Sequence, residues 1–284
     1  MVEPNMEQDF KYQLIDFGHQ QRLESFNGHL VCRPAPQAFG DWADESNLSQ
    51  AQAVCQRVGN KNIWTEDSVF PENWVLSFGE VQVRLKPSSH QTGVFPEQLK
   101  NWQWMQEKVR TAARPLKILN LFGYTGMASL SVAVADSHVQ VTHVDGAKST
   151  IKWAKENAEL TGVENQIRWI CEDVSKFVKK EVRRESKYDA IILDPPAFGR
   201  GPGGEWKIER DLKPLLRNLS KILSKNPLFV VLSCHHPAWS SADLQSELEF
   251  YLGSQFSDSE PVDLTIESSK NETFFLGICG RIFN

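Results

Sequence analysis

The stretch that decides the fold runs Leu193-Asp194-Pro195-Pro196-Ala197-Phe198-Gly199-Arg200-Gly201. It follows an apolar run, residues 188–193, of the kind that forms a buried parallel strand. Two consecutive prolines donate no ladder hydrogen bonds and hold φ near one value, so they end this strand in a stiff turn whose carbonyls stay unpaired. Open α/β sheets bind ligands at the carboxyl ends of their strands. An aromatic ring and a guanidinium follow at once, so we predict that Phe198 and Arg200 bind a flat substrate with an anionic part.

A second ligand-binding element precedes this turn. Residues 117–122 have the pattern of a short buried strand, the turn Gly123-Tyr124-Thr125-Gly126 follows, and residues 127–134 continue as a helix. This layout brings a ligand against bare backbone at a helix N-terminus. The next expected strand, 139–144, ends at Asp145, about twenty residues past the glycine turn, a spacing at which an acid reaches the hydroxyls of a ribose. A third, 166–171, ends in Glu172-Asp173 and places another acid at the same edge.

The glycine turn lacks the third glycine of a dinucleotide fingerprint, and the chain has no phosphate-cradling loop. A ribose-binding acid without a pyrophosphate site favours a nucleoside-like ligand that carries no phosphates. S-adenosylmethionine fits this description, because its adenine, ribose and zwitterionic tail need no phosphate site. Each acid taken singly could be an ordinary surface carboxylate. Four strand ends in order, carrying Gly-Tyr-Thr-Gly, Asp145, Asp173 and Asp194, argue against coincidence.

Residues 117–235 resemble the class I S-adenosylmethionine-dependent methyltransferases and, more narrowly, the bacterial large-subunit ribosomal RNA methyltransferases. The shared motifs are the turn of residues 119–126, the strand end Val144-Asp145 and the turn of residues 194–198. Upstream, residues 92–98 are similar to a segment that precedes the catalytic domain in this group and helps to cover the cofactor. The resemblance implies an α/β fold with a doubly wound, mostly parallel seven-stranded sheet. Residues 1–110 do not match the RNA-binding domain with which many relatives begin.

The cofactor implied by the resemblance is S-adenosyl-L-methionine. The motif matches place its binding residues at Thr92, Phe95, Gln98, Phe122, Gly123, Tyr124, Thr125, Gly126, Asp145, Gly146, Ala147, Asp173, Val174 and Asp194.

The expected catalytic residues are Cys234, Asp194, Pro195 and Pro196. Cytosine C5 is a poor nucleophile, and its methylation needs a thiolate that first adds to C6. Ser233-Cys234 lies at the end of the fifth expected strand, and the 5-methylcytosine members of the group carry such a pair as nucleophile. Cys234 could equally be a small strand-end residue without chemistry. A nitrogen acceptor would then donate to carbonyls around Asp194, Pro195 and Pro196, and in both cases the base must leave its helix.

Composition and charge restrict the class of protein to which this chain can belong. The 284 residues suffice for a catalytic domain with a small partner, and 40% hydrophobic with 24% charged residues is ordinary for a globular protein. No apolar stretch approaches the roughly eighteen residues of a membrane span, the start is polar and acidic, and five cysteines show no metal spacing. These features predict a cytoplasmic protein with free thiols. The net charge is −5, and residues 1–95 hold 7 Lys/Arg against 12 Asp/Glu, which argues against an N-terminal RNA-binding module.

Three segments are expected: a small, mostly β domain at 1–95, a connecting helix at 96–114, and the cofactor-binding domain at 115–284. Strand patterns at 11–15, 22–26 and 29–33, with Asn27-Gly28 as a hairpin turn, support the first. In the third, a basic run over residues 176–187 is interleaved with Glu172, Glu181 and Glu185, which indicates a solvated helix face.

The sequence therefore predicts a cytoplasmic methyltransferase that acts on RNA, with ribosomal RNA as the favoured partner and cytosine C5 as a candidate acceptor. Arg200, Lys207 and Arg210 are candidate phosphate contacts close to the site. Two alternatives remain: a methyltransferase for a small molecule, which the acidic N-terminal region favours, and a cofactor-binding scaffold without activity. The Asp-Pro-Pro turn with its neighbouring aromatic ring argues against a scaffold.

Overall fold

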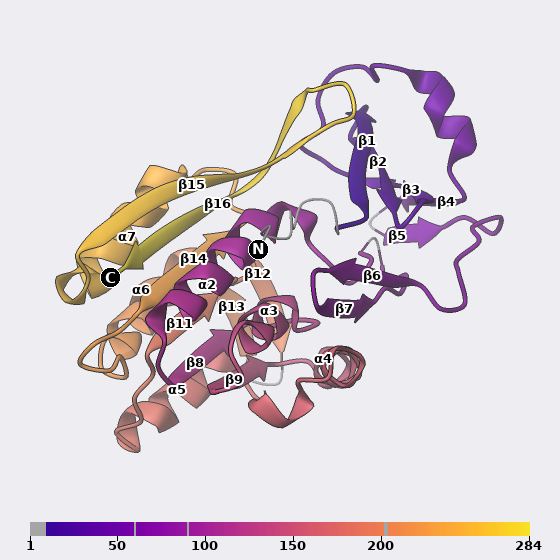
Figure 1. Ribbon diagram of the computed structural model, residues 1–284. Coiled ribbons are helices and arrows are strands. Elements are labelled where there is room, and N and C mark those ends of the chain that lie inside the picture. The colour runs from indigo at the N-terminus through magenta and orange to yellow at the C-terminus, as the bar shows by residue number, and fades with distance from the viewer. Residues whose placement is uncertain (1–9, 60, 90, 202–203) are drawn as a thin grey trace. The chain divides into compact units, whose positions relative to one another are not determined.

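The computed structural model describes residues 10–59, 61–89, 91–201 and 204–284 (Figure 1). The polar start of the chain, residues 1–9, lies outside them. The chain divides into two compact units. The first comprises Met1–Glu97 together with Thr265–Leu276, and the second comprises Gln98–Leu264 together with Gly277–Asn284. None of the helices in the described part of the chain is long and apolar enough to cross a membrane.

The first unit contains, within the described residues, a five-stranded sheet in the order β1-β2-β3-β4-β5 and a separate hairpin of β6 and β7. The bounds are β1 Tyr12–Gly18, β2 Gln21–Phe26, β3 His29–Pro34, β4 Ala53–Val58, β5 Lys61–Trp64, β6 Val75–Phe78 and β7 Val81–Arg84, with 3-10 helices η1 Glu45–Gln50 and η2 Pro96–Gln98. Asn27 and Gly28 connect β2 to β3 and both have positive φ, 54° and 82°, as the expected two-residue hairpin turn requires. The sequence pattern did not reveal β4, which pairs in parallel with β3.

A buried ion cluster lies in the first unit. Arg33 and Glu24 are both 0% exposed, and Arg33 donates to the carboxylate of Glu24 from Nε at 2.5 Å and from Nη2 at 3.0 Å. The Tyr12 hydroxyl donates to the same carboxylate at 2.8 Å, and Arg22 Nε lies 3.3 Å from it. Burial by itself raises the pKa of Glu24, but the two arginines outweigh burial and hold this pKa below its usual value. Each charge therefore depends on its partner, because Arg33 and Glu24 are both fully buried.

The second unit is organised, within the described residues, around a seven-stranded sheet in the order β10-β9-β8-β11-β14-β16-β15. The strands are β8 Leu116–Leu121, β9 Val139–Asp145, β10 Ile167–Cys171, β11 Ala190–Leu193, β14 Phe229–Cys234, β15 Asp258–Glu267 and β16 Thr273–Phe283. The first five pair in parallel, and β16 pairs antiparallel with β14. The predicted fold class, a mostly parallel α/β sheet beside a small β region, is confirmed.

Helices cover both faces of this sheet (Figure 1). Their bounds are α2 Leu99–Ala112, α3 Met127–Ala135, α4 Lys148–Thr161, α5 Val174–Arg183, α6 Ile208–Leu219 and α7 Ser241–Leu252, with 3-10 helices η3 Glu164–Gln166 and η4 Gly253–Gln255. The helices α2, α3 and α4 contact one another in sequence on one face, and α5, α6 and α7 do so on the other. The leucines of α6 recur at helical spacing and are buried in the hydrophobic core.

The strand order indicates at which edge of the sheet a ligand is expected to bind. From β8 the chain proceeds outward to β9 and β10, and it then returns to β11 on the other side of β8. The carboxyl ends of β8 and β11 flank this reversal, which is where open parallel sheets bind ligands. A short hairpin of β12 Phe198–Gly201 and β13 Gly204–Lys207 follows β11 at the same edge.

The strands β15 and β16 each belong partly to both units, because residues 265–276 group with the first. Phe274 and Leu276 pack there with Leu14, Ala35 and Ala38, and Leu14 forms a bridge with Ser268. The sequence-based domain boundaries assigned this terminal pair wholly to the segment 115–284. A pattern read along the chain does not show that two distant apolar segments share one core.

Candidate functional site

The glycine turn after β8 adopts an unusual backbone conformation. Phe122 and Tyr124 have φ of 57° and 49°, and Gly126, at the N-terminus of α3, has φ of 96°. Non-glycine residues in this region are strained, and such strain concentrates at ligand sites. The turn is held by hydrogen bonds from Gly123 N–H to the carbonyl of Val144 (3.1 Å) and from Gly126 N–H to the carbonyl of Gly123 (3.0 Å).

Gly123 is required by its neighbour His143. A Cβ at position 123 would lie 2.3 Å from Cε1 of the His143 ring, too close for any side chain. His143 is buried, its Nδ1 lies 3.0 Å from Ser129 Oγ, and that hydroxyl accepts from Asn120 Nδ2 at 2.8 Å. Burial lowers the pKa of His143 to about 3, so the ring is neutral at physiological pH. The sequence pattern did not reveal this support, although three polar residues, Asn120, Ser129 and His143, stand out inside otherwise apolar elements.

Asp145, at the end of β9, is held in place by three donors. Its Oδ2 accepts from Tyr124 N–H at 3.0 Å, and its Oδ1 accepts from Ala147 N–H at 2.8 Å and from the Thr150 hydroxyl at 2.9 Å. A carboxylate offers about four acceptor positions. One position on Oδ2 is therefore left for a ligand hydroxyl, as a ribose requires. Gly146, between these residues, has open space where a side chain would be.

The other residues expected to bind the cofactor differ in which of their groups are available to a ligand. Asp173 caps α5, because its Oδ1 accepts from Lys176 N–H at 2.9 Å. The side chain of Val174 belongs to the hydrophobic core. Thr125 is buried, and its carbonyl accepts from Asn157 Nδ2 at 2.9 Å. Val174 and Thr125 thus support the edge through packing and backbone, while Asp173 brings a carboxylate to it.

Asp194 joins three strand ends through Gln98. Gln98 Nε2 lies 3.3 Å from Asp194 Oδ2 and 2.8 Å from Ser233 Oγ, to both of which it donates. The backbone N–H of Asp194 also lies 3.4 Å from the carbonyl of Leu121. The ends of β8, β11 and β14 are therefore connected, with Asp194 at their centre. The role of Gln98 in cofactor binding stays a prediction; in the structure its buried amide donates to Asp194.

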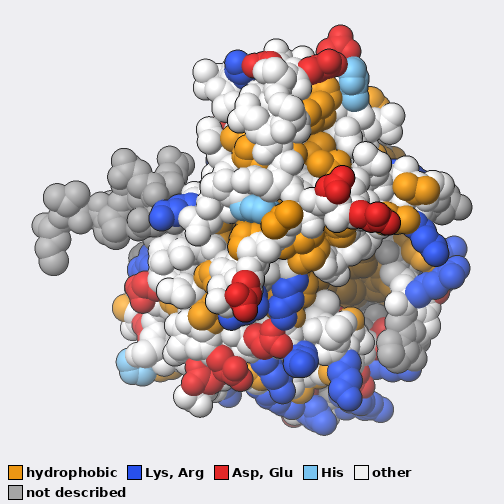
Figure 2. All heavy atoms as spheres, turned by 90° about the vertical axis from the view of Figure 1, so that its right-hand side faces the viewer, with side chains coloured by type: hydrophobic (Ala, Val, Ile, Leu, Met, Phe, Trp, Pro, Cys, Tyr) orange, Lys and Arg blue, Asp and Glu red, His pale blue; other side chains and the backbone are white. Residues whose placement is uncertain are grey.

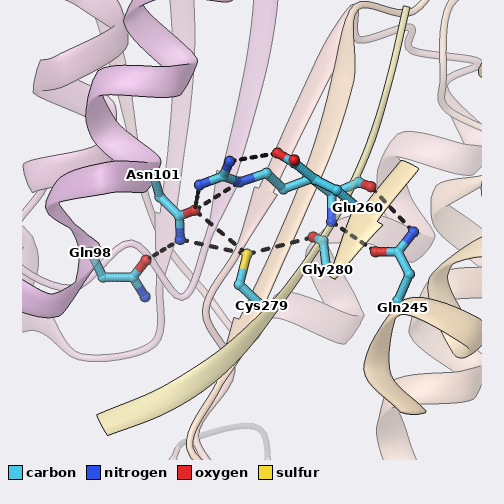
Figure 3. A network of polar contacts seen from close by, with 7 residues as sticks. Gln98, Asn101, Gln245, Glu260, Cys279 and Gly280 are labelled. Atoms are coloured by element: carbon cyan, nitrogen blue, oxygen red, sulfur yellow. Dashed lines mark hydrogen bonds and ion pairs between the residues drawn. The ribbon is translucent and has the colours of Figure 1, made fainter. Parts of the chain in front are cut away.

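A buried polar network orients Gln98 (Figure 3). Asn101 Nδ2 donates to Gln98 Oε1 at 2.6 Å, and Arg281 donates to Asn101 Oδ1 from Nε at 2.9 Å and from Nη2 at 2.5 Å. Nη1 of Arg281 pairs with Glu260 at 2.7 Å. Because the guanidinium makes Asn101 Oδ1 an acceptor, Asn101 must donate to Gln98 Oε1. The amide nitrogen of Gln98 then has to face Asp194.

The Asp-Pro-Pro turn is closed by a tryptophan that sequence analysis did not single out. Trp206 Nε1 on β13 donates to the carbonyl of Pro196 at 2.8 Å, and its ring lies 4.9 Å from that of Phe122. The expectation of unpaired carbonyls therefore fails at Pro196, because the hairpin folds back onto the turn. Pro195 is buried, and the Asp194 carboxylate stays partly exposed at the edge.

Phe198 and Arg200 lie together on β12. The Phe198 side chain is 50% exposed, and the guanidinium carbon of Arg200 lies 5.5 Å from its ring centroid. Lys207 pairs with Glu205 at 3.2 Å, and Arg210 pairs with Asp211 at 2.8 Å. Of the three expected phosphate contacts, Arg200 is thus the one without an acidic partner among the described residues.

Cys234 has an environment that disfavours a thiolate. It is 0% exposed, and burial, with contributions from Asp194 and Cys279, raises its pKa to about 12. His236 does not assist it. Its Nδ1 accepts from Ala238 N–H at 3.3 Å, so its Nε2 carries the proton and donates to Glu209 at 3.0 Å. The ring of His236 is therefore engaged with Glu209 and Ala238, not with Cys234.

Thr92 and Phe95 belong to the first unit. Thr92 is buried and its carbonyl accepts from Lys86 N–H at 3.1 Å. Their part in covering the cofactor remains a prediction.

The comparison with protein families identifies the cofactor of this chain. The model of the S-adenosylmethionine-dependent methyltransferase family matches residues 53–248, more than half of the chain. The chain belongs to this family. The methyltransferase is also similar to the S-adenosylmethionine-dependent methyltransferase of Agrobacterium tumefaciens, with 36% identity, a TM-score of 0.89, and coverage of 96% of this chain and 90% of that one. The cofactor of this chain is S-adenosylmethionine.

More distant structures share the fold of this methyltransferase. One is the methyltransferase SMU.776, solved in complex with SAH, with 17% identity, a TM-score of 0.68, and coverage of 96% of this chain and 76% of that one.

Curated relatives match over shorter stretches. A protein of Methanocaldococcus jannaschii named as a ribosomal RNA large subunit methyltransferase is 27% identical over 66% of this chain and 48% of its own. Ribosomal RNA large subunit methyltransferase K/L of Shewanella frigidimarina is 36% identical over 40% of this chain and 16% of its own. The methyltransferase thus spans less than half the length of these two relatives.

We expect Asp145→Ala to weaken the binding of S-adenosylmethionine by about 5–150-fold, since 1–3 kcal/mol is lost when bound hydroxyls have no acceptor. Isothermal calorimetry measures the change. Asp263→Ala, which removes an exposed carboxylate elsewhere in the second unit, is the matched control and should bind like the wild type. Equal affinity of both variants would remove Asp145 from the cofactor site.

Proposed function

We propose that this methyltransferase transfers the methyl group of S-adenosylmethionine to a base of RNA, and that the RNA is ribosomal. The observation that carries the proposal is the exposed pair of Phe198 and Arg200, directly after the Asp-Pro-Pro turn. An exposed ring suits a base that has left its stack, and a cation beside it suits the adjoining phosphate. The names of the curated relatives support the same substrate class.

When bound, the cofactor would supply an electrophilic methyl group: its bond to sulfur breaks with both electrons kept by sulfur, and the acceptor's lone pair forms the new bond. The protein then has to hold the acceptor in line and settle its proton. Asp194 lies at the ligand edge with one oxygen near Gln98 Nε2, so its carboxylate can accept a hydrogen bond from a base N–H. The same carboxylate can take the proton that the nitrogen loses. Phe198 orients the ring by stacking.

We propose a nitrogen, and not cytosine C5, as the acceptor. Methylation at C5 requires a thiolate at Cys234, and burial keeps this thiol protonated with a pKa of about 12. A base nitrogen needs no covalent intermediate. The groups present at the edge, a carboxylate and an aromatic ring, suffice for it.

The test uses purified enzyme, S-adenosylmethionine with a labelled methyl group, and total RNA from cells that lack the gene. We expect label in ribosomal RNA, with a methylated base identified after digestion. Label confined to a small-molecule fraction would overturn the RNA assignment.

The acceptor atom is tested separately with Cys234→Ala. We expect it to retain the turnover of the wild type, and RNA that contains 5-fluorocytosine should form no denaturation-resistant adduct with either enzyme. Cys171→Ala, which removes the exposed cysteine, controls for the loss of a reactive thiol. An adduct that depends on Cys234 would move the acceptor to cytosine C5.

A further inference from the structure

The helix α5 carries four basic side chains on one face. Lys176, Lys179, Lys180 and Arg183 follow one another at i, i+3, i+4 and i+7, the spacing of neighbours along a helix surface. With Asn218 of α6 they line an open groove of about 500 Å³. Glu172 is the acidic side chain among the described residues of this lining.

The acids interleaved with these lysines in the sequence are separated from them in space. Glu181 is 2% exposed and accepts from the Tyr188 hydroxyl at 2.9 Å and from Arg184 Nη1 at 2.7 Å, away from the groove. Glu185 follows the end of the helix, at φ of 55°. The face is therefore solvent-exposed, as the sequence pattern indicated, but Glu181 and Glu185 do not lie among its basic side chains.

The positive charge of the groove is largely uncompensated. Glu172 pairs with Lys180. For Lys176, Lys179 and Arg183 the described part of the chain shows no ion pair. On the face that Figure 2 presents, Lys and Arg side chains are unevenly spread and gather mainly along the lower edge.

The groove begins at the ligand edge. The first residue of α5 follows Asp173, which ends the turn after β10, at the same edge as Asp145 and Asp194. From there ten residues of helix extend for about 15 Å. A polyanion that lies in the groove can therefore continue to the edge where methyl transfer takes place.

We propose that the α5 groove binds the sugar-phosphate backbone of the RNA substrate. The inference rests on the proposed function and adds the surface that holds the substrate outside the catalytic pocket. Phosphate contacts position a nucleic acid, whereas contacts to the base select it. The groove performs the first task, and Phe198 with Asp194 performs the second. A row of cations along one helix matches the repeating charge of a nucleic-acid strand. It also reconciles an RNA substrate with a chain of net charge −5.

The experiment compares two triple variants of the full chain. One carries Lys176→Ala, Lys179→Ala and Arg183→Ala. The matched control carries Arg110→Ala, Lys221→Ala and Lys225→Ala, which removes the same charge from exposed positions outside the groove. The probe is a fluorescent single-stranded RNA of twenty nucleotides, followed by anisotropy over a range of salt concentrations. Steady-state methylation of ribosomal RNA and calorimetry of S-adenosylmethionine complete the comparison.

We expect the groove variant to bind the probe at least about tenfold more weakly at low salt. The slope of log K against log salt should fall by about 2, since each lost phosphate contact contributes about 0.7 for single strands. Its KM for RNA should rise, while kcat and cofactor affinity stay as in the control variant. Identical behaviour of the two variants overturns the inference. Wild-type enzyme that neither binds nor methylates RNA would instead overturn the proposed function.

Discussion

Replacing Asp194 with alanine is expected to lower kcat for methyl transfer by about 10²–10⁴-fold, the range that a positioned general acid or base contributes. The carboxylate is the group at the centre of three strand ends, and Gln98 holds one of its oxygens. Without it, the base nitrogen loses the carboxylate that we propose as its proton acceptor. Asp194→Asn should be nearly as inactive, because an amide keeps the shape and loses the basicity. Single-turnover methylation of RNA measures the effect without product release.

The same variants distinguish two roles of Asp194. If it acts on the acceptor, calorimetry should show that S-adenosylmethionine binds Asp194→Asn about as well as the wild type. Collapse of cofactor binding with unchanged turnover of the bound enzyme would make Asp194 a cofactor ligand alone. Asp263→Ala, on the exposed side of β15, controls for the loss of a carboxylate and should retain full activity.

Replacing Arg33 with methionine is expected to lower the free energy of unfolding by about 3–5 kcal/mol. The reason is the fate of Glu24, which stays fully buried and loses the partner that makes two hydrogen bonds to it. The double variant Glu24→Gln/Arg33→Met should recover part of the loss, because no buried carboxylate then lacks its partner, whereas the buried Arg22 still loses the charge of Glu24. Urea unfolding followed by circular dichroism compares the three proteins.

The control for this stability measurement is Arg57→Met, at an exposed position of β4, which should change the free energy of unfolding by about 0.5 kcal/mol or less. A loss no larger in Arg33→Met than in Arg57→Met would show that water reaches Glu24. The buried cluster would then contribute little to the stability of the first unit.

The parts of the site that the sequence revealed are those whose chemistry is local. An Asp-Pro-Pro turn after an apolar run ends a strand whatever surrounds it, and a Gly-x-x-Gly turn before a helix exposes backbone amides in the same way. The carboxyl ends of parallel strands meet at one edge, so these local signals sufficed to place Asp145 and Asp194 together. The fold class followed from the same alternation of strands and helices.

The parts that the sequence did not reveal depend on distant pairings. The orientation of Gln98 is set through Asn101 by Arg281, which lies 180 residues further along the chain. The protonation of Cys234 depends on burial, which a Ser-Cys motif does not report. The basic face of α5 was hidden because an interleaved sequence does not show that Glu181 points into the protein.

The passage of β15 and β16 through both units has a consequence for recombination between relatives. The first unit is encoded by two separate stretches, Met1–Glu97 and Thr265–Leu276, and the second stretch supplies Phe274 and Leu276 to the core around Leu14. A chimera joined once near residue 97 would take the first 97 residues from one protein and residues 265–276 from the other. The core of the first unit would then be built from two sequences that did not evolve together. To exchange the first unit between methyltransferases, both Met1–Glu97 and Thr265–Leu276 therefore have to be replaced together.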